Sequence, residues 1–245
     1  MRTCIAVSGL LLGLSVQAAE ISVLSGGAIE PGLKAAAAAF QKQSPHSVKI
    51  TFNTTPQIIK RVSAGETFDV VIAPPGAMKE FATANKVESG GVNVGRVGMG
   101  VLVRPGAPVP DIANAEAIKR VVLDAESIVF NRASTGLYYE GLIKKMGIYE
   151  QIEAKTTRYA DGASVMEHIL KGKGTEVGFA AITEILLYKD KGMNYVGPLP
   201  AAIQNYTAYI AAPMLPAANR HAAESLVSFL GGPIGKPLFV GAGIE

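Results

Sequence analysis

The chain has 245 residues, 49% of them hydrophobic, and its 23 basic and 20 acidic residues give a formal net charge of +3 at pH 7. The charge is small, the basic residues are scattered and tryptophan is absent, which argues against a basic, aromatic-rich surface for nucleic acid. The single cysteine, Cys4, excludes an intrachain disulfide and a thiolate metal site.

Residues 1–19 have the pattern of a secretory signal peptide. Arg2 provides the positive charge, residues 5–16 form a short apolar segment, and small residues lead up to Ala18 and Ala19. The apolar segment is shorter than the roughly 20 residues that a membrane-spanning helix needs. We therefore expect cleavage of this segment, a periplasmic mature protein and no stable membrane insertion.

Short strands and helices alternate after the signal. The hydrophobic spacing predicts them in this order: strand 21–24, helix 33–40, strand 48–52, helix 58–64, strand 69–73 and helix 78–84. Residues 91–104 then read as extended chain with many glycines, and Pro105, Pro108 and Pro110 follow. Because proline and glycine end regular structure, this segment is the best candidate for a crossover between two lobes.

The alternation starts again after these prolines. The pattern predicts helix 118–122, strand 128–130, helix 137–146, helix 166–170, strand 177–180, helix 182–188, strand 206–211 and helix 218–230. Pro198 and Pro200 mark a return crossover.

This order predicts an α/β protein of two lobes. Strands that alternate with helices favour parallel or mixed sheets, and two crossovers divide them into residues 20–100 plus 205–245 and residues 101–204. We expect a ligand cleft between the two sheets, because ligands of open α/β sheets bind beyond the carboxyl ends of the strands.

Three small polar turns fall where such a cleft would lie. Each follows a predicted strand and precedes a helix, where free backbone N–H groups and the helix dipole favour an anion. Each turn also has a purely structural interpretation, as a tight turn or a helix cap. The turns are Ser25-Gly26-Gly27, Thr54-Thr55 and Ser134-Thr135-Gly136.

The chain resembles the periplasmic solute-binding proteins of ABC transporters, in the group around the molybdate-binding proteins. The resemblance covers nearly the whole mature chain and rests on residues 21–39, 64–72, 134–138, 172–179, 228–230 and 243–245. It implies a monomer that captures a small anion, such as molybdate or an organic carboxylate, and passes it to an ABC permease. No cofactor is implied, and the histidines share no metal-ligand spacing.

Two positions depart from that group, in which serine hydroxyls, backbone N–H groups and a tyrosine hydroxyl hold the oxyanion. Ala28 stands where a serine is expected and Ala181 where the tyrosine is expected. Thr54 or Thr55, Thr135 and Ala163 match the remaining contacts.

Fewer donors and a wider pocket favour a larger organic anion over a tetrahedral oxyanion. A carboxylate is matched best by arginine. Arg96 at the crossover is the first candidate, followed by Arg132, Arg158 and Lys60.

The same group also includes aconitate isomerase-like proteins, which move a proton and a double bond within a tricarboxylate. Such an enzyme needs a base beside an acidic C–H bond, which the sequence does not place; His168 is the only histidine to consider. The sequence thus leaves two interpretations open, a binding protein and an isomerase on the same scaffold.

Overall fold

The structure is a computed structural model that describes residues 17–245. Most of the predicted signal peptide, residues 1–19, therefore lies outside the described residues. The strands are β1 (Glu20–Gly26), β2 (Ser47–Asn53), β3 (Val70–Ala73), β4 (Val92–Val103), β5 (Ser127–Asn131), β6 (Thr156–Tyr159), β7 (Glu176–Ala181), β8 (Asn194–Pro198) and β9 (Tyr206–Pro213).

The helices alternate with these strands. The α-helices are α1 (Glu30–Gln43), α2 (Thr55–Ser63), α3 (Pro75–Thr83), α4 (Ala115–Asp124), α5 (Ser134–Lys145), α6 (Tyr149–Ile152), α7 (Gly162–Lys171), α8 (Ile182–Leu186), α9 (Arg220–Gly231) and α10 (Gly235–Gly241). Short 3₁₀ turns are η1 (Gly27–Ile29), η2 (Glu153–Lys155), η3 (Lys189–Lys191) and η4 (Ala201–Ile203).

Each strand and helix that the hydrophobic patterns predict is present. Among the strands and α-helices, the patterns miss four, β6, β8, α6 and α10. Strand β6 is only partly buried along its whole length, so it lacks the alternation of buried and exposed side chains that identifies a strand. Helix α6 is a single turn of four residues, too short to show a helical period.

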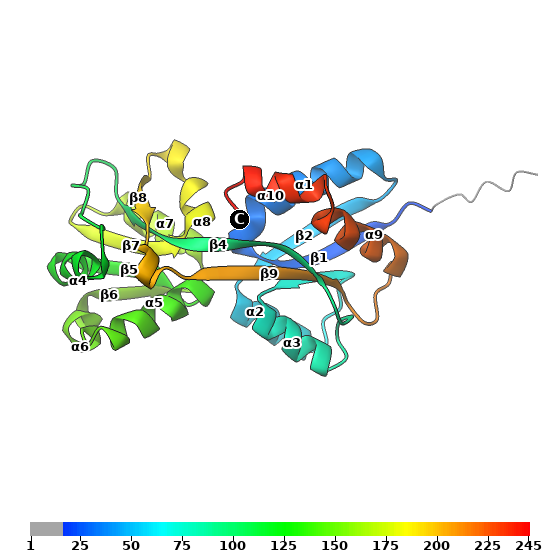
Figure 1. The fold of residues 1–245 in the computed structure, drawn as a ribbon, viewed down its shortest axis with the longest axis horizontal. Helices are drawn as coiled ribbons and strands as arrows, with labels where there is room; N and C mark the ends of the chain where they lie inside the picture. The colour runs from blue at the N-terminus through cyan, green and yellow to red at the C-terminus, as the bar shows by residue number, and fades with distance from the viewer. Residues whose placement is uncertain (1–16) are drawn as a thin grey trace, which may run out of the picture.

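Strand β4 joins two mixed sheets into one nine-stranded network, in the order β2-β1-β3-β9-β4-β7-β5-β6 with β8 beside β4. Its first part, Val92 to Gly98, pairs antiparallel with β9, and its second part, Met99 to Val103, pairs antiparallel with β7. Strand β1 is parallel to both β2 and β3, whereas β5 is parallel to β6 and β7. The predicted first crossover is thus a single long strand that runs through both lobes (Figure 1).

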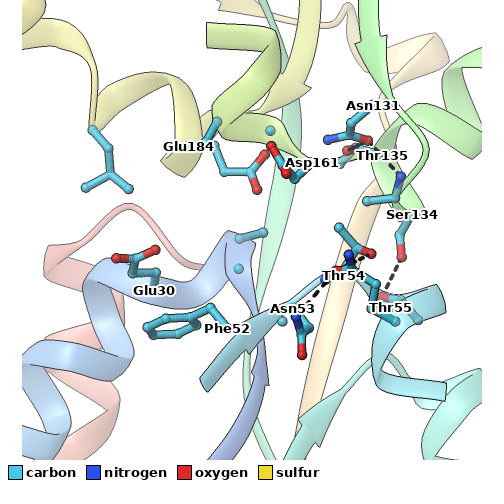
Figure 2. Close-up of a pocket in the computed structure, with 18 of the residues that line it drawn as sticks. Glu30, Phe52, Asn53, Thr54, Thr55, Asn131, Ser134, Thr135, Asp161 and Glu184 are labelled. Carbon is cyan, nitrogen blue, oxygen red and sulfur yellow. Dashed lines mark hydrogen bonds between the residues drawn. The ribbon is translucent and has the colours of Figure 1, made fainter. Parts of the chain in front are cut away.

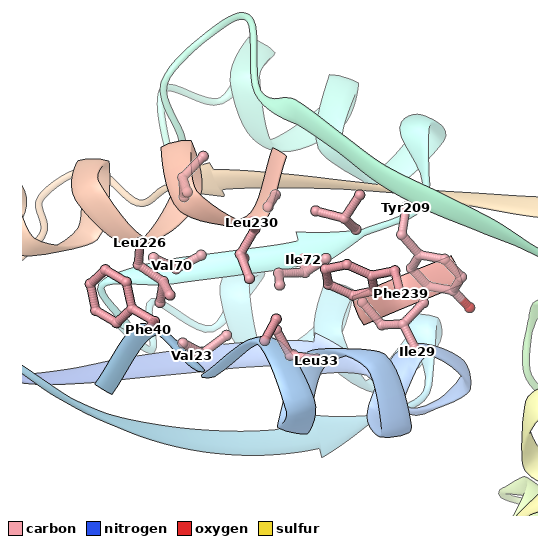
Figure 3. Packing of buried hydrophobic residues seen from close by; sticks show 14 of the residues in the cluster. Val23, Ile29, Leu33, Phe40, Val70, Ile72, Tyr209, Leu226, Leu230 and Phe239 are labelled. Carbon is pink, nitrogen blue, oxygen red and sulfur yellow. The ribbon is translucent and has the colours of Figure 1, made fainter. Parts of the chain in front are cut away.

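The buried side chains form separate cores on the two sides. The first lobe holds α1, α9 and α10 against β1 and β3, and Leu33, Leu226 and Phe239 belong to the buried cluster between them (Figure 3). The second lobe has its own core around Phe130, Tyr139 and Phe179.

Along β4, the two cores divide near residue 98. Val97 belongs to the first-lobe core, and Met99 belongs to the second. The division of the chain into residues 20–100 plus 205–245 and residues 101–204 stays a prediction.

The end of the chain is attached to β4 at the crossover. The backbone N–H of Arg96 donates to the carbonyl of Glu245 at 2.7 Å, and the N–H of Glu245 donates back at 2.9 Å. Gly95, at a φ of +137°, makes this approach feasible, because a Cβ there would lie 2.6 Å from Ile244. Within residues 17–245, none of the helices has the length and hydrophobicity that a membrane span requires.

Candidate functional site

A pocket of about 420 Å³ lies between the two lobes (Figure 2). Its walls come from the loops that follow β1, β2, β5, β6 and β7, together with β9. The lining residues are Gly26, Gly27, Ala28, Glu30, Phe52, Asn53, Thr54, Thr55, Gln57, Asn131, Ala133, Ser134, Thr135, Asp161, Gly162, Ala163, Glu184, Leu187, Tyr188 and Tyr209.

Helix beginnings from both lobes converge on this pocket. Helix α2 begins there at Thr55, α5 at Ser134 and α7 at Gly162. The first-turn N–H groups of a helix have no partner within it, and the helix dipole places partial positive charge at the same end. The pocket therefore presents neutral donors and aligned dipoles, which suit an anion.

Most of the residues predicted for the site line this pocket together. They are Gly26, Gly27, Thr54, Thr55, Ser134, Thr135 and Ala163. Ser25 does not: it is fully buried, and its hydroxyl donates to the carbonyl of Gly26. Gly136 also lies behind the wall, where it allows close packing, because a Cβ there would fall 1.7 Å from the carbonyl oxygen of Asn131.

The expectation that Arg96 contacts the ligand is corrected by its position. Its guanidinium pairs with Glu245 at 2.9 Å and stacks 4.3 Å from the Tyr206 ring, and its side chain is 53% exposed. Neighbouring Val97 is buried in the first-lobe core, so the alternation along β4 directs Arg96 away from that core.

The other basic candidates are also outside the pocket. Arg158 is held by the hydroxyl of Tyr149 and the carboxylate of Glu140. Neither Arg132 nor Lys60 lines the pocket, and among the described residues that do line it there is no lysine, arginine or histidine.

Two contacts join the lobes at the pocket. The hydroxyl oxygens of Thr55 and Ser134 lie 2.9 Å apart, at hydrogen-bond distance (Figure 2). Behind the pocket, the buried hydroxyl of Thr183 donates to the carbonyl of Ala28. Each contact pairs a first-lobe residue with a second-lobe residue, so both stabilise this arrangement of the lobes.

Asn131 organises the beginning of α5, a role that sequence reasoning missed. Its Oδ1 accepts hydrogen bonds from the Ala133 N–H, the Gly136 N–H and the Thr135 hydroxyl, at 3.0, 3.2 and 3.3 Å. Its buried Nδ2 has no hydrogen-bond partner among the described residues. Because Asn131 lines the pocket, this amide is a further donor for a ligand.

The sequence analysis also does not identify Glu184 as a site residue, although its position in the sequence could have indicated one. It stands in the first turn of the helix predicted directly after a buried strand, at the same sheet edge as the polar turns. Its Oε2 is buried and has no hydrogen-bond partner in the part of the chain that the structure describes. Burial raises the pKa of Glu184 to about 7, the Ala181 N–H lowers it in part, and the charges of Asp161 and Glu30 raise it further.

The other two carboxyl groups in the pocket have partners. Asp161 caps α7, because its Oδ1 accepts a hydrogen bond from the Ser164 N–H at 2.8 Å. Glu30 pairs with Lys34 one turn along α1 at 2.5 Å. Within residues 17–245, no group of three or more histidine, cysteine or acidic side chains has an arrangement that could hold a metal ion.

The two alanines that replace expected hydroxyl donors, Ala28 and Ala181, lie in different places relative to the pocket. Ala28 lines the pocket without a hydroxyl, whereas Ala181 is buried and does not line it. Tyr209 on β9 supplies a phenol to the pocket instead, and burial raises its pKa far above the ordinary tyrosine value. His168 is outside this pocket, with its Nδ1 at 2.9 Å from the Tyr159 hydroxyl.

Comparison with known proteins gives relatives of two kinds. The chain is 27% identical over 217 residues to an aconitate isomerase from Pseudomonas sp, covering 86% of this chain and 81% of that protein. It is 26% identical over 244 residues to the molybdate-binding protein ModA of Azotobacter vinelandii, covering 95% and 92%.

The solved structures agree on the fold. The periplasmic molybdate-binding protein of Azotobacter vinelandii matches with a TM-score of 0.76 at 15% identity, over 92% of this chain and 98% of that one. The sulfate-binding protein SubI from Mycobacterium tuberculosis matches with a TM-score of 0.74 at 15% identity, over 92% and 86%. The family profile described as bacterial extracellular solute-binding protein matches residues 21–245. The chain therefore belongs to the bacterial extracellular solute-binding proteins.

Proposed function

We propose that this chain captures a small anion in the cleft between its lobes and presents it to an ABC permease from the periplasmic side. The observation that carries the proposal is the convergence of helix beginnings from both lobes on one pocket with uncharged donors. The family membership supports capture outside the cytoplasm.

Mass spectrometry of the exported protein tests the location: its chain should begin at Ala19 or Glu20, and an intact Met1 would contradict export by cleavage.

The preferred ligand is an organic carboxylate rather than a tetrahedral oxyanion. A pocket of about 420 Å³ falls in the range typical of organic ligands. Its walls include apolar surface from Phe52, Leu187 and Tyr188. Ala28 has no hydroxyl to donate to a small oxyanion, where the molybdate-binding group has a serine. The carboxylate would be held by the Asn131 Nδ2, unpartnered among the described residues, by the hydroxyl pair of Thr55 and Ser134 and by backbone N–H groups of the first turn of α5, and not by arginine.

A ligand panel tests this preference. Thermal shift and calorimetry with molybdate, tungstate, sulfate, citrate, cis-aconitate and trans-aconitate should show the tightest binding for a di- or tricarboxylate. A ligand at 100-fold excess over its Kd stabilises the folded state by about 2.7 kcal/mol, which such a screen detects. Tight molybdate binding with no response to any carboxylate would reverse the order.

A second candidate function is isomerisation of a small polycarboxylate, and Glu184 favours it. Its carboxyl lines the pocket and has a pKa of about 7, close to the value at which a group both accepts and returns a proton efficiently near neutral pH. Such a base would remove a proton from the carbon next to a carboxylate, the double bond would shift, and the proton would return at the other end.

Proton NMR of cis- and trans-aconitate incubated with the protein tests this activity. Interconversion that Glu184→Gln abolishes while aconitate binding remains would establish the enzyme. If ligand binds tightly and neither isomer changes, the protein is a binding protein.

A further inference from the structure

The carboxyl of Glu184 occupies an enclosed position at the second-lobe side of the pocket. Gly162 at the start of α7 lies directly against it, since a Cβ there would fall 2.3 Å from Oε2. Gly27 faces it from the first lobe, where a Cβ would lie 3.7 Å from Oε1. The buried Oε2 of Glu184 has no hydrogen-bond partner among the described residues. The carboxyl therefore lies at the pocket with one oxygen free to hydrogen bond with a ligand (Figure 2).

An ionised Glu184 would conflict with an anion in the same pocket. No cationic side chain is present among the described lining residues to offset the repulsion. The charged groups that face Glu184 are Asp161, the residue that caps α7, and Glu30 from α1, and both are acidic. The titratable hydroxyls nearby are Tyr209 from β9 and Tyr188 beyond the end of α8, which bring no positive charge.

Resting on the proposed anion-binding function, we infer that the Glu184 carboxyl carries a proton in the complex and donates it in a hydrogen bond to the bound anion, so that anion capture takes up a proton. A protonated carboxyl has one O–H donor, and a hydrogen bond from it to an anionic oxygen is of the short, charge-assisted kind. The proton therefore turns the Glu184 carboxyl, whose Oε2 has no partner among the described residues, into a ligand contact.

The inference predicts how affinity changes with pH. The free protein holds this proton only partly at neutral pH, because the pKa of Glu184 is about 7. The bound anion raises that pKa, so binding is strongest below pH 7 and weakens as the pH rises through it. Above this value, the Kd rises about tenfold per pH unit for one proton taken up.

Calorimetry between pH 7 and pH 9 tests this, with trans-aconitate and sulfate as probes whose acid groups stay ionised over that range. Titrations in buffers of different ionisation enthalpy count the protons. We expect uptake approaching one proton per anion at pH 8 in the wild type. In Glu184→Gln, whose amide still donates but does not titrate, we expect a Kd independent of pH and no dependence of the enthalpy on the buffer.

Glu30→Gln is the matched control. It removes a carboxyl from the same pocket but one that is already paired with Lys34, so the dependence of Kd on pH should remain. A wild-type Kd that is constant between pH 7 and pH 9, or one that changes equally in Glu184→Gln, would overturn the inference and leave the proposed function intact.

A measurement on the protein without ligand further separates the inference about Glu184 from the proposed anion-binding function. In ¹³C NMR of the free protein, one glutamate carboxyl should titrate near pH 7, and its signal should be missing in Glu184→Gln. A Glu184 signal that titrates with the exposed glutamates would overturn the inference even if no probe binds. Failure of every anion to bind, by contrast, would overturn the proposed function.

Discussion

At the scale of single residues, Gly162 determines where the Glu184 carboxyl can lie. An added methyl group would approach Oε2 to 2.3 Å, so Gly162→Ala should displace the carboxyl while the helix still forms. We expect a folded protein whose anion affinity falls at least tenfold, or about 1.4 kcal/mol. Calorimetry with the best ligand of the panel measures this loss.

Gly141 is the matched control for that change. It is exposed in α5 and a Cβ there would meet no atom within 4 Å. Gly141→Ala should therefore leave affinity unchanged and stabilise the fold by about 0.5–1 kcal/mol, because alanine is the better helix former. Unchanged affinity in Gly162→Ala would show that the carboxyl does not take part in binding.

Thr135 and Arg96 form a second pair of residues with opposite expectations. Thr135 lines the pocket at the start of α5 and its hydroxyl holds the Asn131 amide, so Thr135→Ala should loosen that amide and lower anion binding by about 0.5–1.5 kcal/mol, the net range for one hydrogen bond. Arg96→Ala should leave affinity unchanged, because the side chain lies outside the pocket in an exposed pair with Glu245. Circular dichroism checks that both variants fold. If only Arg96→Ala loses anion affinity, the assignment of the binding site to this pocket is wrong.

At the scale of secondary-structure elements, Asp69 ties three segments together. Its Oδ2 accepts from the N–H and the hydroxyl of Ser22 in β1 at 2.8 and 2.7 Å, and its Oδ1 accepts from the N–H of Asn219 before α9 at 2.8 Å. The residue itself precedes β3. Burial acts to raise the pKa of Asp69, but these hydrogen bonds outweigh it and hold the pKa below its usual value.

The stability that Asp69 provides should depend on pH. A carboxylate whose pKa is depressed by folding stabilises the protein above its unfolded pKa and loses that contribution as the pH falls through the folded pKa. Asp69→Asn should cost about 2 kcal/mol at pH 7 and progressively less below pH 4, as measured by urea unfolding. Asp190→Asn, at an exposed position in η3, is the control and should change little at either pH.

At the scale of the whole molecule, the hydroxyl pair Thr55–Ser134 bridges the cleft between the lobes. Removing one partner costs roughly 1 kcal/mol, which shifts the balance between closed and open lobes about fivefold toward open forms. Small-angle scattering should give a larger radius of gyration for Ser134→Ala than for wild type. If the two radii agree both with and without ligand, the pair does not hold the lobes together.

The order of elements could be predicted because its signals are local. Alternation along β2 and the apolar run of β3 identify strands within a few residues, and the spacing of Ile58 and Val62 identifies the buried face of α2. Polar turns directly after strands likewise indicated most of the pocket, because strand ends meet at one sheet edge.

Other features of the site could not be predicted, since they depend on contacts between distant segments. The direction of Arg96 follows from the pairing of β4 with β9 and with the end of the chain. The phenol at the pocket comes from Tyr209, in a strand far from the polar turns. The sequence by itself determined an α/β chain with helix beginnings suited to an anion. Only the tertiary structure decided that Glu184 loses water, faces Asp161 and Glu30 and meets no cation among residues 17–245 that line the pocket, because burial and charge around a side chain are properties of the packed molecule.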